Sequence, residues 1–231
     1  MIIDHKLNLI FIAVPKTGST SIHFFLKNVL SVNTIYITTN KNFFKKNIAL
    51  AKHSSSLDIK NMIHDYDSYH TFAVVRNPYD WCVSWYTSWG SGVDSWYLRV
   101  KEREAEVKGL LTDEMKRIAH PYGNMTFEEF LKDFKYIVEV EQLDRLTDEN
   151  GKIIVDTIIR YENLETEFLS LLDKLNINYS TDPRVLDLGL SRENVSSERG
   201  NRDYREFYNA DTKRLVEEYQ MKTIKHFNYK F

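Results

Sequence analysis

Twice before residue 90 of this chain, a short apolar run is followed within two residues by a cationic residue and then by a helical pattern. Leu7 to Val14 is nearly continuously apolar, as in a strand buried on both faces of a sheet, and Lys16 follows it. Apolar residues then recur at helical spacing from Ser19 to Leu30. Thr71 to Val75 is a second such run and ends at Arg76, before another helix. Strands that alternate with helices predict an α/β fold with a central parallel sheet flanked by helices.

The rest of the chain continues this alternation. Asn77 and Pro78 are a helix-start signal, because asparagine caps helices and proline is tolerated in the first turn. Residues Gly90 to Gly123 break the rhythm, and we expect a lid or insertion there within a single domain spanning residues 1–231. We expect further strands at Thr34–Thr38 and Thr157–Arg160, a hairpin within Gln142–Val155, and helices at Ser55–Tyr66, Pro78–Trp89, from Thr126, at Glu165–Leu175 and at Asp211–Phe227.

Composition excludes several classes of partner. The chain has 31 Lys and Arg against 33 Asp and Glu, and a net charge of −2 gives no reason to expect nucleic-acid binding. Cys82 is the single cysteine, so no intrachain disulfide forms, and no Cys/His spacing indicates a metal. The apolar run near the N-terminus is too short for a signal peptide or a membrane span. We therefore expect a cytoplasmic protein with no membrane span and no metal.

The loop Pro15–Thr20 joins the first strand to its helix and is rich in hydroxyl groups. Backbone N–H groups and the helix dipole meet at such a junction and favour a phosphate. The loop is not a Walker A motif, because Lys16 precedes Gly18 whereas that motif places its lysine after the last glycine. ATP hydrolysis is therefore disfavoured, and a plain turn with a helix cap is the alternative interpretation.

A second anion-binding pattern follows the strand that ends at Arg76. The planar guanidinium of Arg76 can donate two hydrogen bonds to one anion, and Ser84 on the following helix adds a hydroxyl. Taken alone, Arg76 would form a salt bridge at the strand end and Ser84 would be a small packing residue. Two such junctions in one sheet indicate a ligand with two phosphate groups.

Both junctions resemble the sulfotransferases that use 3′-phosphoadenosine 5′-phosphosulfate (PAPS), most closely the carbohydrate O-sulfotransferase branch that includes heparan sulfate 2-O-sulfotransferase. Val14-Pro-Lys-Thr-Gly-Ser-Thr-Ser21 is similar to that family's 5′-phosphosulfate loop, and Arg76-Asn-Pro-Tyr with Ser84 is similar to its 3′-phosphate motif. The resemblance spans nearly the whole chain except Gly90–Gly123, and it implies a P-loop-NTPase-like α/β domain. Its further matches are Ala51–Ser54, Val155–Asp156, Ile159–Leu164 and Phe227–Phe231.

The resemblance implies how PAPS would be held. Lys16 would contact the bridging oxygen and the departing 5′-phosphate, and Arg76 with Ser84 would hold the 3′-phosphate. Tyr161 matches a position near the adenine, although a tyrosine at a strand end also serves plain packing. Cytosolic relatives carry an adenine-stacking tryptophan where this chain has Ser21. The N–H groups and hydroxyls of Thr17, Gly18, Ser19, Thr20 and Ser21 would hold the 5′ end, and Arg199 and Gly200, in a loosely matching basic loop, would lie over the 3′-phosphate.

The resemblance also implies a reaction, the transfer of the sulfonate group from PAPS to a hydroxyl of a saccharide or glycoconjugate, with release of 3′-phosphoadenosine 5′-phosphate (PAP). Such transfer needs a base for the hydroxyl proton and a cation for the leaving phosphate, and in principle no metal. His53 matches the base and Lys16 the cation, so these two are the expected catalytic residues. A lone histidine is otherwise a surface or core residue. Two alternatives stay open: a nucleotide-dependent kinase of related fold, and a non-catalytic PAP- or PAPS-binding protein.

Overall fold

The computed structural model describes residues 1–30, 34–36, 43–45, 48–50, 52–89, 125–133, 135, 139–179 and 199–231. The chain divides into two compact units, which we call the sheet unit (Met1–Arg76 and Gln142–Asn194) and the helical unit (Asn77–Glu141 and Val195–Phe231). The lid or insertion expected at Gly90–Gly123 lies outside the described residues. The single-domain organisation around it stays a prediction.

The sheet unit is built on a five-stranded sheet in the order β3-β1-β2-β6-β7. β2 (Leu9–Ile12), β6 (His70–Val75) and β7 (Thr157–Arg160) run parallel, as the sequence predicts. β1 (Ile2–Asp4) pairs antiparallel with β2 and with β3 (Ile35–Tyr36). The sheet is therefore mixed, because two antiparallel strands extend the parallel part that the sequence predicts.

The antiparallel part of the sheet arises from a tight turn between β1 and β2. The Asp4 carboxylate accepts hydrogen bonds from the backbone N–H groups of Lys6 and Leu7, at 2.9 and 2.8 Å. Asn8 adopts a left-handed φ of 48°, which asparagine tolerates better than most residues. The chain therefore reverses before Leu9, and the strand expected from Leu7 begins only there.

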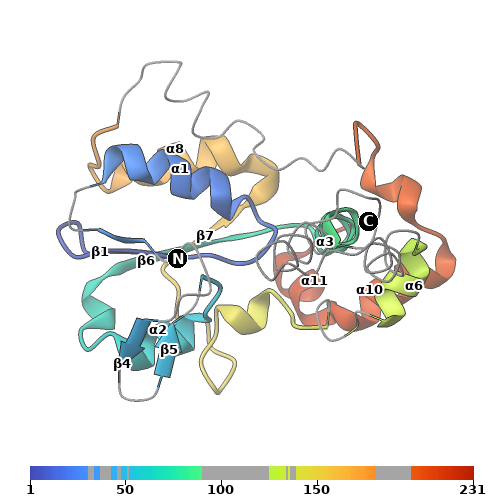
Figure 1. Cartoon of the computed structure of the whole chain (residues 1–231), viewed down its shortest axis with the longest axis horizontal. Coiled ribbons are helices and arrows are strands. Elements are labelled where there is room, and N and C mark those ends of the chain that lie inside the picture. The colour runs from blue at the N-terminus through green and yellow to red at the C-terminus, as the bar shows by residue number, and fades with distance from the viewer. Residues whose placement is uncertain are drawn as a thin grey trace, which may run out of the picture. The chain divides into compact units, whose positions relative to one another are not determined.

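Helices cover both faces of this sheet (Figure 1). α1 (Ser19–Val29) and α8 (Leu164–Lys174) lie side by side on one face, and α2 (Ser56–Met62) lies on the other. Alternate residues of the parallel strands join the core beneath α1 and α8, where Phe11 stacks on Phe72 with 4.8 Å between ring centroids. The short strands β4 (Phe43–Lys45) and β5 (Ile48–Leu50) pair antiparallel as a separate ribbon.

Two expected elements are corrected by the structure. The hairpin expected within Gln142–Val155 is present only as a short reversal, with one antiparallel bridge between Thr147 and Ile153, and its first arm begins as a 3₁₀ turn, η2 (Leu143–Arg145). The last helix is broken into α10 (Ala210–Tyr219) and α11 (Met221–Phe227). A tertiary contact accompanies the break: the Glu141 carboxylate accepts the N–H groups of Lys222 and Thr223, at 3.0 and 2.5 Å, and so caps a new helix. Further 3₁₀ turns are η1 (Tyr66–Ser68) and η3 (Tyr161–Asn163).

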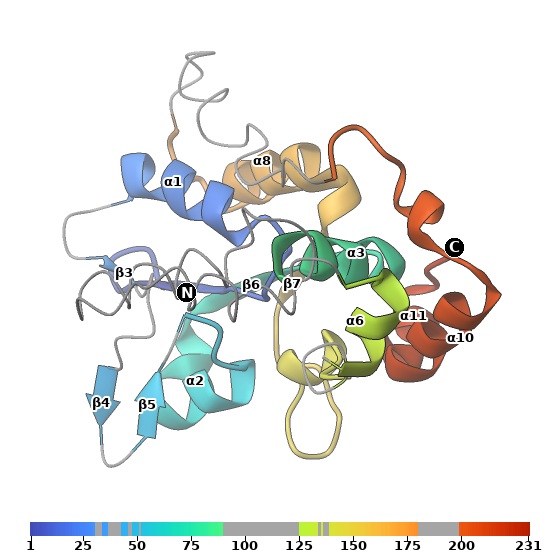
Figure 2. The same ribbon diagram turned by 45° about the vertical axis from the view of Figure 1, so that its right-hand side comes forward.

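The helical unit packs α3 (Pro78–Trp89), α6 (Phe127–Asp133), α10 and α11 with the 3₁₀ turn η4 (Tyr204–Phe207), as Figure 2 shows. α3 begins at Pro78 as predicted, and the side-chain oxygen of Asn77 accepts the N–H of Tyr79 at 3.1 Å. The capping box predicted before α6 is present, since Thr126 and Glu129 each accept the other's backbone N–H. The core of this unit includes Tyr79, Trp81, Cys82, Val83, Phe127, Phe130, Leu131, Val216 and Tyr219.

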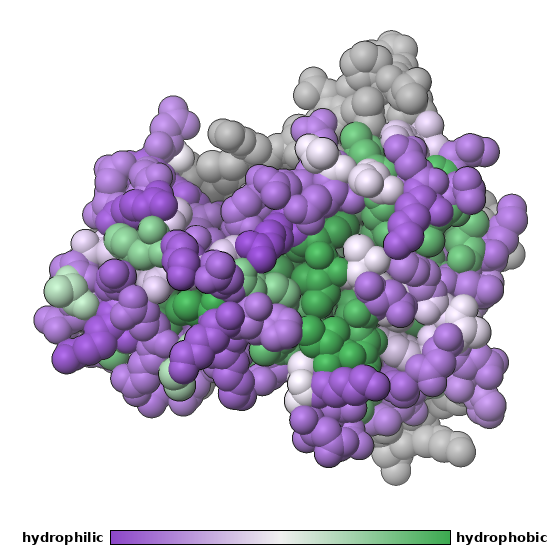
Figure 3. Space-filling view, turned by 180° about the vertical axis from the view of Figure 1, so that it is seen from behind, coloured by the Kyte–Doolittle hydropathy of each residue, from purple (hydrophilic) through white to green (hydrophobic). Residues whose placement is uncertain are grey.

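The described surface is mostly polar. Figure 3 shows one face on which hydrophilic side chains cover most of the area. Among the described residues, the large apolar side chains that are clearly exposed are Leu7, Phe24, Val140 and Met221. Within the same residues, no helix has the length and the apolar character needed to cross a membrane.

Candidate active site

The loop between β2 and α1 turns sharply and leads into the helix. Lys16 and Gly18 both adopt left-handed φ angles, of 62° and 79°. The Thr17 hydroxyl donates to the Val14 carbonyl at 2.9 Å and fixes the turn from inside. Among the described contacts, α1 has no side-chain cap and no acidic residue in its first turn, so its positive end keeps an affinity for anions. Of the expected loop residues, Thr17, Ser19 and Ser21 are buried, and Lys16, Gly18 and Thr20 are half-buried.

Gly18 lies so close to neighbouring side chains that any larger residue at this position would contact them. A Cβ atom built on Gly18 would lie 3.0 Å from Cδ2 of Leu164 and 3.1 Å from Cε2 of Tyr161. Both neighbours follow the carboxyl end of β7. The glycine therefore lets the loop after β2 approach the chain after β7, which brings Tyr161 to the expected phosphate loop.

We expect Gly18→Ala to destabilise the fold more than Gly151→Ala, which is a matched control. The two glycines have nearly the same φ, 79° and 77°, but a Cβ atom at Gly151 meets nothing within 4 Å. Left-handed strain should lower the free energy of unfolding by about 1–2 kcal/mol in both variants, and displacement of Tyr161 or Leu164 should add roughly 1–3 kcal/mol at Gly18. Urea unfolding measures the difference. Equal losses would show that the close approach at Gly18 is relieved without cost.

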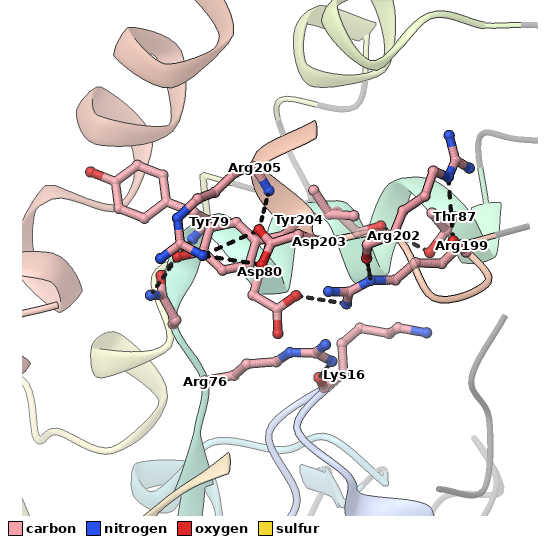
Figure 4. A network of polar contacts seen from close by, with 12 residues as sticks. Lys16, Arg76, Tyr79, Asp80, Thr87, Arg199, Arg202, Asp203, Tyr204 and Arg205 are labelled. Carbon is pink, nitrogen blue, oxygen red and sulfur yellow. Dashed lines mark hydrogen bonds and ion pairs between the residues drawn. The ribbon is translucent and has the colours of Figure 1, made fainter. Parts of the chain in front are cut away.

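Arg76 leaves the carboxyl end of β6 and is fixed on several sides. Its Nη1 donates to the backbone oxygen of Lys16 at 3.1 Å (Figure 4), and its Cζ lies 4.2 Å from the ring centroid of Tyr161. Its backbone N–H and C=O are both bonded to the side-chain amide of Gln142, each at 2.8 Å. Because β2 and β6 are parallel neighbours, Lys16 and Arg76 meet at one edge of the sheet.

Positive charge gathers at this edge. Burial, together with repulsion from Arg76 and Lys52, lowers the pKa of Lys16 to about 8. Burial also lowers the pKa of Lys52. Cations that repel one another in the free protein are stabilised when an anion binds among them. The loop after β2 and the end of β6 therefore form a candidate anion-binding site at the first turn of α1.

His53 reaches the same edge from the segment before α2. Its Nδ1 lies 2.7 Å from the Ala13 carbonyl oxygen, and since a carbonyl only accepts, Nδ1 carries the proton and Nε2 keeps the lone pair. Burial, together with the charges of Lys52, the Met1 amine and Arg145, lowers the pKa of His53 to about 4. The hydrogen bond to Ala13 raises this pKa but does not outweigh burial. The imidazole is therefore neutral at pH 7 and can accept a proton at Nε2.

Ser84, Arg199 and Gly200 belong to the helical unit. Nη1 of Arg199 lies 2.6 Å from Oδ1 of Asp80, and the two side chains are 19% and 14% exposed (Figure 4). Ser84 lies one helical turn after Asp80, so Asp80 and Ser84 share a face of α3. Within this unit Arg199 is thus held at the face of α3 that carries Ser84. Gly200 is exposed with a left-handed φ of 54°.

Three residues that contact the expected site residues were missed by the sequence reasoning. Asp80 had an available signal, because it follows Arg76-Asn-Pro-Tyr and precedes Ser84 by one helical turn. Gln142 and Arg145 had none, since they contact Arg76 and His53 from 66 and 92 residues away in the sequence. Such contacts exist only in the folded chain.

A cavity of about 350 Å³ opens at the other edge of the sheet. Its lining includes Tyr69 and Asp156, which directly precede β6 and β7, so the cavity is separate from the anion-binding edge. Two lysines and two aspartates line its wall, so the cavity has no excess of positive charge for an anion: Lys60, Lys152, Asp67 and Asp156. Across the described part of the chain, no group of three or more His, Cys, Asp or Glu side chains is arranged to hold a metal ion.

Comparison with known proteins adds one observation to this geometry. A model of the sulfotransferase family matches residues 1–230, and so covers the loop with Lys16, the segment with His53 and the strand end with Arg76. No curated protein and no solved structure matches the chain. Since the family match extends over nearly all of the 231 residues, the chain belongs to the sulfotransferase family.

Proposed function

We propose that this protein transfers the sulfonate group of PAPS to a hydroxyl of a saccharide or glycoconjugate and releases PAP. The observation that carries the donor assignment is the meeting of Lys16 and Arg76 at the first turn of α1, beside the neutral imidazole of His53. An anion-binding edge next to a base is what transfer from an anionic donor to an alcohol requires. The saccharide as acceptor rests on the sequence resemblance.

In the proposed reaction the acceptor hydroxyl gives its proton to Nε2 of His53. The hydroxyl oxygen forms a bond to sulfur while the bond between sulfur and the bridging oxygen of the 5′-phosphate breaks. The electron pair of that bond stays with the phosphate, where the Lys16 ammonium stabilises the growing negative charge. The N–H groups and hydroxyls from Thr17 to Ser21 would hold the same phosphate.

The assignments in the helical unit remain part of the proposal. Ser84, Arg199 and Gly200 are proposed at the 3′-phosphate together with Arg76. Arg199 is already paired with Asp80, so a phosphate would have to share or replace that ion pair. Tyr161 stacks on the guanidinium of Arg76, which supports a role in orienting Arg76 beside its proposed role near the adenine.

PAP should bind and stabilise the protein, because its phosphates relieve the repulsion among the buried cations. At a thousandfold excess over Kd, a ligand that binds only the folded state adds about 4 kcal/mol to the free energy of unfolding. A thermal-shift comparison of PAP, PAPS, ATP and ATP with magnesium measures this. No shift with saturating PAP would remove the nucleotide assignment.

The same comparison separates the two alternatives. Stabilisation by ATP with magnesium and not by PAP would favour a kinase. Stabilisation by PAP without any transfer would favour a binding protein. Mass spectrometry of glycans and small alcohols incubated with PAPS detects an added sulfonate group and so identifies the acceptor.

Arg76→Ala should weaken the binding of PAP by roughly 2–4 kcal/mol, because it removes a charged donor from the 3′-phosphate. The same variant should weaken adenosine 5′-phosphosulfate much less, because that ligand has no 3′-phosphate and loses only the support that Arg76 gives to the Lys16 loop. Calorimetry with both ligands measures the two losses, and Arg214→Ala, an exposed arginine of α10, is the control. Equal losses for both ligands would place the 3′-phosphate elsewhere.

A further inference from the structure

One turn of the sheet unit, Gln142–Arg145, holds the backbones of both Arg76 and His53. The amide of Gln142 accepts from the Arg76 N–H and donates to the Arg76 carbonyl, each at 2.8 Å. Nη1 of Arg145 donates to the His53 carbonyl at 2.7 Å. Residues 143–145 form the turn η2, which connects the side chain of Gln142 to that of Arg145.

We propose that Gln142 and Arg145 are positioning residues for sulfonate transfer, Gln142 acting through Arg76 and Arg145 acting through His53. The inference rests on the proposed function, because it takes Arg76 as the anion ligand and His53 as the base. Both contacts are to main-chain atoms. Gln142 therefore positions the backbone from which the Arg76 side chain extends, and Arg145 positions the backbone of His53.

Gln142 replaces a strand neighbour that Arg76 lacks. The pairing of β6 with β7 ends at Val75 and Arg160, so Arg76 lies one residue beyond the ladder. The buried amide of Gln142 bonds both main-chain groups of Arg76, as a neighbouring strand would. Gln142 therefore holds the backbone of Arg76 in the extended conformation of β6, one residue beyond the last strand pair.

Arg145 fixes the other end of His53. His53 lies outside any strand or helix. Its Nδ1 is bonded to the Ala13 carbonyl, and its own carbonyl accepts a hydrogen bond from Arg145, so the residue is fixed at two separate atoms. Nε of Arg145 is buried and has no hydrogen-bond partner in the described part of the chain. An unpaired buried N–H lowers stability, and an apolar side chain would avoid it. Stability alone is therefore a poor reason for an arginine here.

The test compares Gln142→Met, Arg145→Met and Arg145→Lys with Phe168→Leu, a core change in the same unit that touches neither Arg76 nor His53. Gln142→Met should raise the Kd for PAP by about tenfold and leave kcat at saturating PAPS near wild type. Arg145→Met should lower kcat by about ten- to a hundredfold and leave the Kd for PAP unchanged. Arg145→Lys should keep more of kcat than Arg145→Met, because it retains a charged donor for the His53 carbonyl. Gln142→Glu keeps the acceptor for the Arg76 N–H and replaces the methionine variant if that fails to fold.

A titration of the free protein separates failure of this inference from failure of the proposed function. Burial is the main cause of the low pKa of His53, and the charges of Lys52, the Met1 amine and Arg145 lower this pKa as well, so Arg145→Met should raise it, whereas Arg145→Lys should not. NMR of the imidazole needs neither PAPS nor acceptor. If the wild-type protein does not bind PAP, the proposed function fails and the titration still tests the contact. The inference is overturned if the His53 titration is unchanged in Arg145→Met, or if Gln142→Met and Arg145→Met change Kd and kcat in the same way as Phe168→Leu.

Discussion

His53→Ala should lower the rate of sulfonate transfer by about 10²- to 10⁴-fold, the usual contribution of a positioned general base. The affinity for PAP should stay close to wild type, because the neutral imidazole gives no charge to the phosphates. Steady-state rates and calorimetry on the same protein measure the two quantities. His64→Ala, which removes an exposed histidine of the same unit, is the control and should change neither.

The charge state of His53 gives this prediction a second readout. In the free protein its pKa is about 4, so the imidazole is neutral but only a weak base. Phosphate groups bound beside it stabilise the imidazolium, and the pKa should therefore rise when PAP binds. NMR titration of His53 with and without PAP measures the shift. Near-normal turnover in His53→Ala would remove histidine from the mechanism and point to another base.

Lys16→Met should lower turnover by about 10²- to 10³-fold, because it removes a cation that stabilises charge on the leaving phosphate. It should also weaken PAP by about tenfold, since the ground-state phosphate is already anionic. The two catalytic variants therefore differ in kind, because loss of His53 spares binding and loss of Lys16 does not. Lys27→Met, an exposed lysine of α1, is the control.

The lowered pKa of Lys16 adds a pH dependence to PAP binding. Below a pH of about 8 the ammonium is charged in the free protein, and PAP meets it directly. Above that pH the free protein must take up a proton at Lys16 to bind PAP equally well, so the affinity should fall as pH rises. Calorimetry between pH 7 and about 9.5 measures the slope, with the upper limit set below the usual lysine pKa. A slope that persists in Lys16→Met would assign it to another group.

Much of the sheet unit follows from local sequence. Short apolar runs bounded by turn signals are typical of buried strands, so β2 and β6 were predictable near their observed bounds, and the half-buried β7 was predicted at its observed bounds. Cap residues are equally local, and Asn77, Pro78, Thr126 and Glu129 mark helix starts correctly. The antiparallel β1 was not predicted: the turn at Asp4 is local, but the strand also pairs with β3, more than 30 residues along the chain, and that pairing exists only in the folded protein.

The sequence by itself determined which residues carry charge and hydroxyl groups at the strand ends, and so the kind of ligand that we propose for this protein. Lys16, Arg76 and His53 could be named because strand–loop–helix junctions and short motifs are local patterns. Only the tertiary structure decided that Arg76 stacks on Tyr161, that the proton of His53 sits on Nδ1, and that Gln142 and Arg145 hold both segments. These features depend on hydrogen bonds and burial between residues far apart in the chain, and such contacts arise only when the sheet brings its carboxyl ends together.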